Sequence, residues 1–305
     1  MKKNWLWIMI GFVFIPLLMG FFGSLNWILD VFSHFRVYYC TAFFLIGIIA
    51  LILKKWKESG VSLILSSILF LSFADLYLPV KESRSSAGLS IASINLLSSN
   101  NNFEEVIGFI KSNNFDVIFF QELNTKWESE LEILNDDFPT RAMFAREDNF
   151  GIGVISKINS AFVQEADFSS VNIPSLILTF PDNKEEVTII NTHPLPPVGS
   201  FYFNARNEQF EILNRIISKM DQQVVLIGDL NSTRFSPNFK RLLENGKLRD
   251  SRIGFGLLPT WHAQFPFISL TLDHAFVTDG IEVLDRRVGP DIGSDHLPVI
   301  IEVGW

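Results

Sequence analysis

The chain has 305 residues, which allows one domain of ordinary size and a smaller unit if a domain takes roughly 150 residues. Hydrophobic residues make up 48% of the chain, and they are concentrated before position 80. Its single cysteine, Cys40, lies in an apolar run, which excludes an internal disulfide framework, a cysteine-based metal site and a catalytic thiol.

The charge divides at the same place as the hydrophobicity. Six Lys and Arg residues against three acids give the part before position 81 a net charge of +3, which leaves 19 basic against 30 acidic residues, a net charge of −11, in the remainder. A part this acidic is a poor partner for bulk nucleic acid, whose non-specific binding rests on phosphate neutralisation by Lys and Arg. A nuclease is not excluded, because a bound divalent cation would change the local field.

Residues 1–80 contain three apolar stretches, 5–22, 38–53 and 61–78. Each is close to the roughly 17–25 residues that a helix needs to cross a bilayer, so we predict three N-terminal transmembrane helices and the lipid bilayer as a partner. Two other interpretations remain. The first stretch could be a cleaved signal peptide, and all three could be buried core helices.

Lysines flank these stretches asymmetrically. Lys2 and Lys3 precede the first, and Lys54, Lys55 and Lys57 separate the second from the third. The positive-inside rule then places the N-terminus and the lysine-rich loop in the cytoplasm. Three crossings would leave the rest of the chain on the far side of a bacterial inner membrane. We therefore expect a multi-pass cell-membrane protein with an extracytoplasmic catalytic domain.

A polar linker, 81–88, precedes the soluble domain, 89–305. In this domain, short apolar runs alternate with stretches of helical periodicity, which predicts a layered α/β or α+β fold. The expected strands are 89–95, 116–121, 153–156, 175–180, 187–191, 224–228, 270–277 and 298–303, and the expected helices are 103–112, 126–134, 201–220 and 238–244.

Polar residues end, follow or interrupt the predicted strands at six places. Strand ends present side chains to a shared cleft, so these places are expected to converge. They are Asn95, Glu122, Asn191 with His193, Asp229 with Asn231, Asp273 with His274, and Asp295 with His296.

The order of these motifs resembles the endonuclease/exonuclease/phosphatase (deoxyribonuclease I-like) superfamily. The matching segments, in chain order, are SINLL, FFQELN, NTHP, GDLNS, LDHAF and GSDHLPV, with TW at Thr260 and Trp261 ahead of the fifth. They span about residues 90–300. The resemblance implies a two-sheet sandwich flanked by helices and a phosphoric ester hydrolase that uses Mg²⁺ or Mn²⁺.

The resemblance also assigns metal ligands. Glu122 would be the main ligand, Asn95 would support that site and Asp295 would be a further ligand. Hard oxygen donors of this kind suit Mg²⁺ or Mn²⁺.

The catalytic roles that the resemblance implies fall to five residues. Asp229 would orient or deprotonate the attacking water, and Asn231 would hydrogen-bond the phosphoryl oxygen. His296 would be a second acid/base or phosphate contact, with Asp273 holding its ring in the right tautomer. His193 would contact the phosphate.

Single members of the set carry little weight, because an Asn or Asp after a strand is more often a turn former. His274 is expected to be a packed histidine, and His34 and His262 to be surface or interfacial residues. Arg206, early in the long helix, is either a substrate contact or a solvated helix residue. Because these motifs occur together and in one order, we favour the functional interpretation of the whole set over the structural interpretation of each member.

The sequence departs from many nucleases of the superfamily at Leu97, where those proteins carry an acid. This departure weakens a two-metal proposal. The proline-rich PLPPVG after His193 resembles the membrane-bound bacterial members instead. We therefore expect hydrolysis of phosphomono- or phosphodiesters of membrane lipids or lipid-linked envelope intermediates. An extracytoplasmic nuclease and an inactive membrane-bound binding protein are the alternatives.

Overall fold

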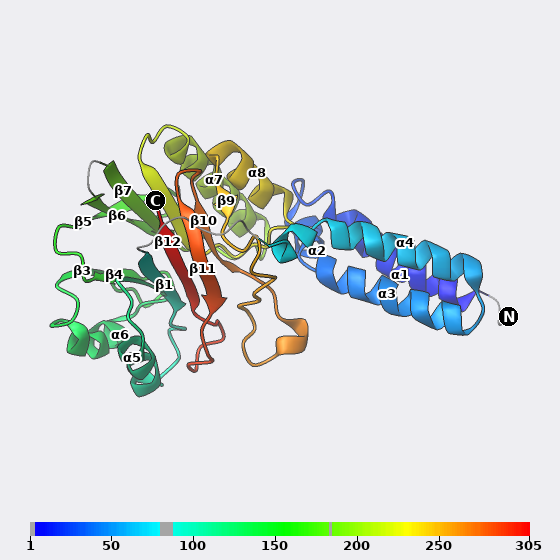
Figure 1. Cartoon of the computed structure of the whole chain (residues 1–305), viewed down its shortest axis with the longest axis horizontal. Helices are drawn as coiled ribbons and strands as arrows, with labels where there is room; N and C mark the ends of the chain where they lie inside the picture. Colours follow the sequence, from blue (N-terminus) through cyan, green and yellow to red (C-terminus); the bar gives the residue numbers. More distant parts are fainter. Residues whose placement is uncertain (1–3, 80–87, 183–184) are drawn as a thin grey trace.

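The computed structural model describes residues 4–79, 88–182 and 185–305. A bundle of N-terminal helices projects from one end of a larger unit that contains two β-sheets (Figure 1). The predicted linker 81–88 lies outside the described residues except for Gly88.

The first sheet has six strands in the order β11-β12-β1-β2-β4-β3. Within it, β1 runs parallel to β2, and the other neighbours are antiparallel. Its strands are β1 (Leu89–Asn95), β2 (Val117–Gln121), β3 (Thr140–Phe144), β4 (Ile152–Ser156), β11 (Glu282–Val288) and β12 (Val299–Gly304).

The second sheet also has six strands, in the order β5-β6-β7-β8-β10-β9. Here β7 and β8 are parallel, and the other pairs are antiparallel. Its strands are β5 (Phe162–Asp167), β6 (Pro174–Asp182), β7 (Glu185–Thr192), β8 (Gln223–Asp229), β9 (Arg249–Asp250) and β10 (Asp273–Val277).

The two sheets pack face to face around a buried apolar layer. Alternate residues of the central strands fill it, such as Val117 and Phe119 of β2 and Val225 and Ile227 of β8. Helices cover the outer face of each sheet, which confirms the predicted two-sheet sandwich flanked by helices. These helices are α5 (Phe103–Ser112), α6 (Thr125–Glu130) and η2 (Leu131–Leu134) on the first sheet, and α7 (Ser200–Ile217) and α8 (Pro237–Gly246) on the second.

The strands absent from the sequence prediction are β3, β5, β9 and β11, and these are the edge strands of the two sheets. Edge strands are partly exposed, so they carry polar residues in place of a continuous apolar run. The predicted strand 270–277 is shorter in the structure, because Leu270 forms an isolated bridge with Trp261 and β10 begins at Asp273.

The N-terminal unit consists of four α-helices and a 3₁₀ turn around a small apolar core. Among the described residues, no single helix is both long and apolar enough to cross a membrane alone. The helices α2 and α3, which are bent by 55° relative to each other, are together long and apolar enough for one crossing by length and composition. The elements are α1 (Trp5–Gly20), α2 (Trp27–Ser33), α3 (Arg36–Ile52), α4 (Trp56–Leu71) and η1 (Ala74–Tyr77).

This unit contacts the loop that follows β8. The ring of Phe73 packs edge-on against Phe235, with 6.0 Å between centroids. Arg234 pairs with Asp75 at 2.8 Å. Phe235 therefore belongs to the core of the helical bundle although it lies in the sequence of the sandwich.

We expect Phe119→Ala to lower the free energy of unfolding by about 3–5 kcal/mol, because the truncation leaves a cavity in the layer between the sheets. Urea unfolding of the full chain measures the change. The control is Phe162→Ala on edge strand β5, where the side chain is 67% exposed. Equal losses in the two variants would contradict the assignment of the main core to this layer.

Candidate active site

The strand registers bring the predicted site residues to one end of the sandwich. Asn95 is the last residue of β1, and Glu122 follows β2 directly. Asp229 ends β8, and the antiparallel register places it opposite Asp273, the first residue of β10. The Asn95 side-chain amide donates to both Glu122 and Asp229, at 3.2 Å each, and so joins the two sheets.

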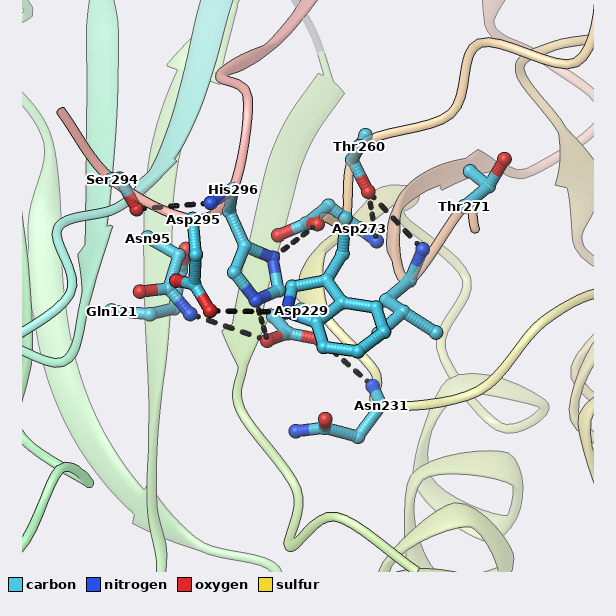
Figure 2. Close-up of polar contacts among 12 residues, drawn as sticks. Asn95, Gln121, Asp229, Asn231, Thr260, Thr271, Asp273, Ser294, Asp295 and His296 are labelled. Atoms are coloured by element: carbon cyan, nitrogen blue, oxygen red, sulfur yellow. Dashed lines mark hydrogen bonds and ion pairs between the residues drawn. The ribbon is translucent and has the colours of Figure 1, made fainter. Parts of the chain in front are cut away.

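The other predicted residues come from loops at the same end. His193 follows β7, and its Nε2 lies 3.5 Å from Asp229 Oδ2. Asp295 and His296 precede β12, and Figure 2 shows the His296 ring between Asp273 and Asp229. The structure thus brings the whole predicted set together.

Left-handed backbone redirects two of these side chains. Glu122 has φ of +55° and Asn231 has φ of +48°. Residues with Cβ atoms rarely adopt this region, and such strain clusters at functional sites where the surroundings hold it. Gly228, with φ of +145°, is also required, since a Cβ there would lie 2.1 Å from the carbonyl oxygen of Thr192.

The His296 ring is held by Asp273. Its Nδ1 lies 2.7 Å from Asp273 Oδ2, and both side chains are buried. Burial alone would lower the pKa of His296, but the charges of Asp273 and Asp229 outweigh this and raise it to about 10. The imidazole is therefore protonated at neutral pH, with Nε2 facing Asp229 at 3.7 Å.

Asp229 has close polar neighbours on both of its carboxylate oxygens. Its Oδ1 accepts the Asn231 backbone N–H at 2.9 Å, and its Oδ2 faces Asn95, His193 and His296. Burial and the nearby charge of Asp273 raise the pKa of Asp229 to about 6. Burial would raise the pKa of Asp273, but the charge and hydrogen bond of His296, together with the hydrogen bond of Thr260, outweigh it and hold that pKa below its usual value.

A divalent cation fits the side of the site formed by Glu122, Asn95 and Asp295. Burial raises the pKa of Glu122, whose oxygens accept only from Asn95 and from the Ser98 backbone among the described residues. Asp295 Oδ2 accepts from Trp261 Nε1 at 3.0 Å, while its buried Oδ1 has no hydrogen-bond partner in the described part of the chain. An unsatisfied buried carboxylate oxygen beside a second carboxylate is a donor set for Mg²⁺ or Mn²⁺.

A second group could also hold a cation by distance alone. Single ligand atoms of Asp229, Asp273 and His296 lie within 4.8 Å of one another. In this structure His296 Nδ1 already bonds Asp273 Oδ2 at 2.7 Å, whereas Asp295 Oδ1 has no partner among the described residues. The Glu122 side is therefore the better fit for a cation.

The comparison with protein families agrees with this geometry. The profile described as "Endonuclease/Exonuclease/phosphatase family" matches residues 92–296, about two thirds of the chain. The chain belongs to this family. Its members are hydrolases that act on phosphoesters. No curated protein matches the chain by sequence.

Solved structures of the endonuclease/exonuclease/phosphatase family share the sandwich. D. rerio TDP2 in complex with a single-strand DNA product is 15% identical, with a TM-score of 0.60, over 72% of this chain and 100% of that one. A family protein from Bacteroides vulgatus is 16% identical, with a TM-score of 0.59, over 72% and 100%. The Bacteroides thetaiotaomicron mannosyl-6-phosphatase is 17% identical, with a TM-score of 0.54, over 71% and 100%. At these identities the likeness shows the fold.

Two further histidines, His274 and His34, are buried in contacts of their own, and the packing of His274 agrees with the sequence prediction. His274 is packed against Phe239 and Phe276, and its Nε2 lies 2.8 Å from the Ser232 carbonyl. His34 is interfacial, since its Nδ1 lies 3.0 Å from Thr233 Oγ1 across the junction of the two units.

Both sequence interpretations of Arg206 were wrong. Its side chain is fully buried, so it is neither solvated nor open to a substrate. It pairs with Asp30 of α2, at 2.7 Å between Nη2 and Oδ2. Asp30 is the single acid of an otherwise largely apolar helix, and the sequence pattern of that helix does not indicate a contact with the sandwich.

The motif resemblance assigns no role to Thr260 and Trp261, and the structure supplies a contact for each residue. Thr260 Oγ1 accepts from the backbone N–H of Asp273 at 3.2 Å (Figure 2). Trp261 orients Asp295 through its indole N–H. The position of Thr260 and Trp261 ahead of the LDH motif is the sequence feature from which a role at the site could have been predicted.

We expect Asp273→Asn to lower the pKa of His296 from about 10, because the main charge that stabilises its imidazolium is removed. NMR titration of ¹⁵N-labelled histidine, without added divalent metal, measures the shift. Asp279→Asn, at a carboxylate that is 89% exposed, is the control and should leave the titration unchanged. An unaltered His296 pKa in Asp273→Asn would contradict the assigned pairing.

Proposed function

We propose that the chain is a divalent-metal-dependent phosphoesterase that hydrolyses phosphomono- or phosphodiesters of membrane lipids or lipid-linked envelope intermediates. One observation carries the proposal. Asp229 lies within 3.7 Å of both His193 and His296 and is joined through Asn95 to Glu122. An acid–base group and a cation-binding group therefore share one cleft.

Glu122 and Asp295 would hold Mg²⁺ or Mn²⁺, with Asn95 in support. Such a cation polarises the phosphoryl oxygen when it is bound. Among the described residues, Glu122 and Asp295 are the carboxylates on this side of the site. Leu97 stands where many nucleases carry an acid. These donors favour a single cation.

Asp229 is the base for the attacking water in this proposal. With a pKa of about 6 it is ionised at neutral pH, yet basic enough to accept a proton. His296, protonated and fixed by Asp273, stabilises the negative charge that develops on the phosphoryl group and can protonate the leaving oxygen.

His193 and Asn231 would contact the phosphoryl oxygens. Burial lowers the pKa of His193, so its ring is neutral and can donate one hydrogen bond from Nε2. The Asn231 side chain donates to the Pro194 carbonyl at 3.0 Å, which places it beside the same loop.

We assign the N-terminal unit to the membrane. Large apolar side chains point outward from three of its helices, among them Phe12 at 81%, Ile52 at 73% and Leu71 at 72% exposure. A lipid environment would cover this surface, whereas in water it would be an aggregation-prone patch. The start of α1 and the α3–α4 turn, which carries Lys54 and Lys55, lie at the end of the bundle far from the sandwich (Figure 1). By the positive-inside rule this end would be cytoplasmic and the sandwich extracytoplasmic.

The segment around η3 (Pro266–Ile268) supports a lipid substrate. Phe265, Phe267 and Ile268 are 56%, 91% and 61% exposed. Between this segment and the start of α3 lies a cavity of about 350 Å³, lined mainly by apolar side chains. A lipid phosphoester could place its chain against such a surface and its phosphate in the neighbouring cleft.

A nuclease is the second candidate, favoured by the likeness to the D. rerio TDP2 structure with a DNA product. The acidic balance of residues 81–305 opposes it.

The test uses the full chain in detergent micelles, with phosphatidic acid, a phosphodiester lipid and single-stranded DNA as substrates. We expect Mg²⁺-dependent turnover of a lipid phosphoester that falls roughly 10²–10⁴-fold in Asp229→Asn, because the base is lost. Asp221→Asn, at an exposed carboxylate, is the matched control.

Three results would reject this function. Cleavage of DNA without turnover of lipid would establish the nuclease. Turnover of no substrate, with the fold intact, would favour a binding protein. Equal turnover by Asp229→Asn and by the unmodified chain would remove Asp229 from the reaction.

A further inference from the structure

The loop that carries Asn231 is held from outside the sandwich by the corner between α2 and α3. Asp30 Oδ1 accepts from the Ser236 hydroxyl at 2.7 Å, and His34 meets the Thr233 hydroxyl at 3.0 Å. Asp30 is fully buried. The helical unit therefore contacts the polar backbone turn that begins at the catalytic Asp229.

Arg206 links this corner to Asn231 itself. Its Nη2 donates to Asp30 Oδ2 at 2.7 Å, and its Nη1 donates to the carbonyl oxygen of Asn231 at 3.3 Å. The guanidinium is planar and presents several N–H donors at fixed angles, so the position of Nη2 fixes the position of Nη1. Asn207 Oδ1 also accepts from Nε and Nη2, at 3.2 and 2.8 Å. Asp30 and Asn207 together therefore determine where Arg206 can hold the Asn231 carbonyl, and Asp30 is the member of this pair that comes from the helical unit.

Asn231 needs such support because its backbone lies in the left-handed region, with φ of +48°. In this conformation its N–H reaches Asp229 Oδ1 at 2.9 Å, and its side chain reaches the Pro194 carbonyl. A relaxed backbone would move both the Asn231 amide group and a hydrogen bond to the catalytic carboxylate. The three contacts of Asn231 therefore act on a single strained residue.

We propose that the N-terminal helical unit is a positioning element of the active site, in which Asp30 acts through Arg206 to hold Asn231 and Asp229 in their working geometry. The inference rests on the proposed phosphoesterase function and adds to it. The helices would then do more than tether the domain, and a fragment cut after residue 80 would leave the buried charge of Arg206 without its partner.

The experiment compares Asp30→Asn, Arg206→Lys and Asp75→Asn in the full chain in detergent micelles. Lysine keeps the charge that pairs with Asp30, but one ammonium cannot hold the Asn231 carbonyl in the same fixed fork. We expect Asp30→Asn and Arg206→Lys to lower kcat roughly 10- to 100-fold with little change in KM, because the catalytic groups are displaced while the substrate surface remains. Asp75→Asn breaks an ion pair between the units that holds Arg234 and makes no contact with Arg206 or Asn231, and it should keep kcat within about twofold of the unmodified chain.

Amide hydrogen exchange of the segment 229–232, followed by mass spectrometry, gives a readout that needs no activity. Exchange should accelerate in Asp30→Asn and Arg206→Lys and stay unchanged in Asp75→Asn. Unmodified exchange in the first two variants would overturn the inference, and so would an equal loss of kcat in all three. If the unmodified chain hydrolyses no phosphoester, the proposed function fails, and the exchange result alone then decides whether Asp30 positions the loop.

Discussion

The site depends on two carboxylates that the β8–β10 register places directly opposite each other in the protein interior. Asp229 and Asp273 could not both remain ionised there without a cation between them, and the His296 imidazolium supplies it. The pairing is unequal, because His296 bonds Asp273 at 2.7 Å and stands 3.7 Å from Asp229. This difference separates the two pKa values, so Asp273 stays a fixed anion while Asp229 remains basic. A slip of one residue in the register would turn both side chains to the other face of the sheet.

The two sheets contribute different groups of residues to the site. The first sheet provides Asn95 and Glu122, the oxygen donors suited to a cation, and the second provides Asp229 and Asp273, the carboxylates on either side of His296. The loop before β12 reaches both sides, since Asp295 lies with the first group and His296 with the second (Figure 2). The relative position of the two groups is therefore set by the apolar layer between the sheets, and packing far from the cleft contributes to its geometry.

The helical unit adds a constraint that neither sheet provides. The turn after Asp229 has polar groups to satisfy and a left-handed residue to hold, and α2 supplies the partners through Asp30. A buried carboxylate on an apolar helix is costly unless it is paired. Its two hydrogen bonds explain how that cost is offset, and they join the turn after Asp229 to an otherwise apolar helix.

The central strands could be predicted from the sequence pattern, the two layers were implied by the family resemblance, and the predicted site residues lie close together in the structure. Strands buried on both faces appear as apolar runs, and the polar residues that follow them can be identified by position, as with Glu122 and Asp229. The four edge strands were not predictable, because an exposed strand keeps no such run. Only the tertiary structure decided the partners of Arg206 and the unequal pairing of His296. Asp30 and Arg206 are 176 residues apart, and their contact exists only once two separate units have packed together. Periodicity and motif order describe neighbours along the chain, whereas a buried ion pair depends on which surfaces meet.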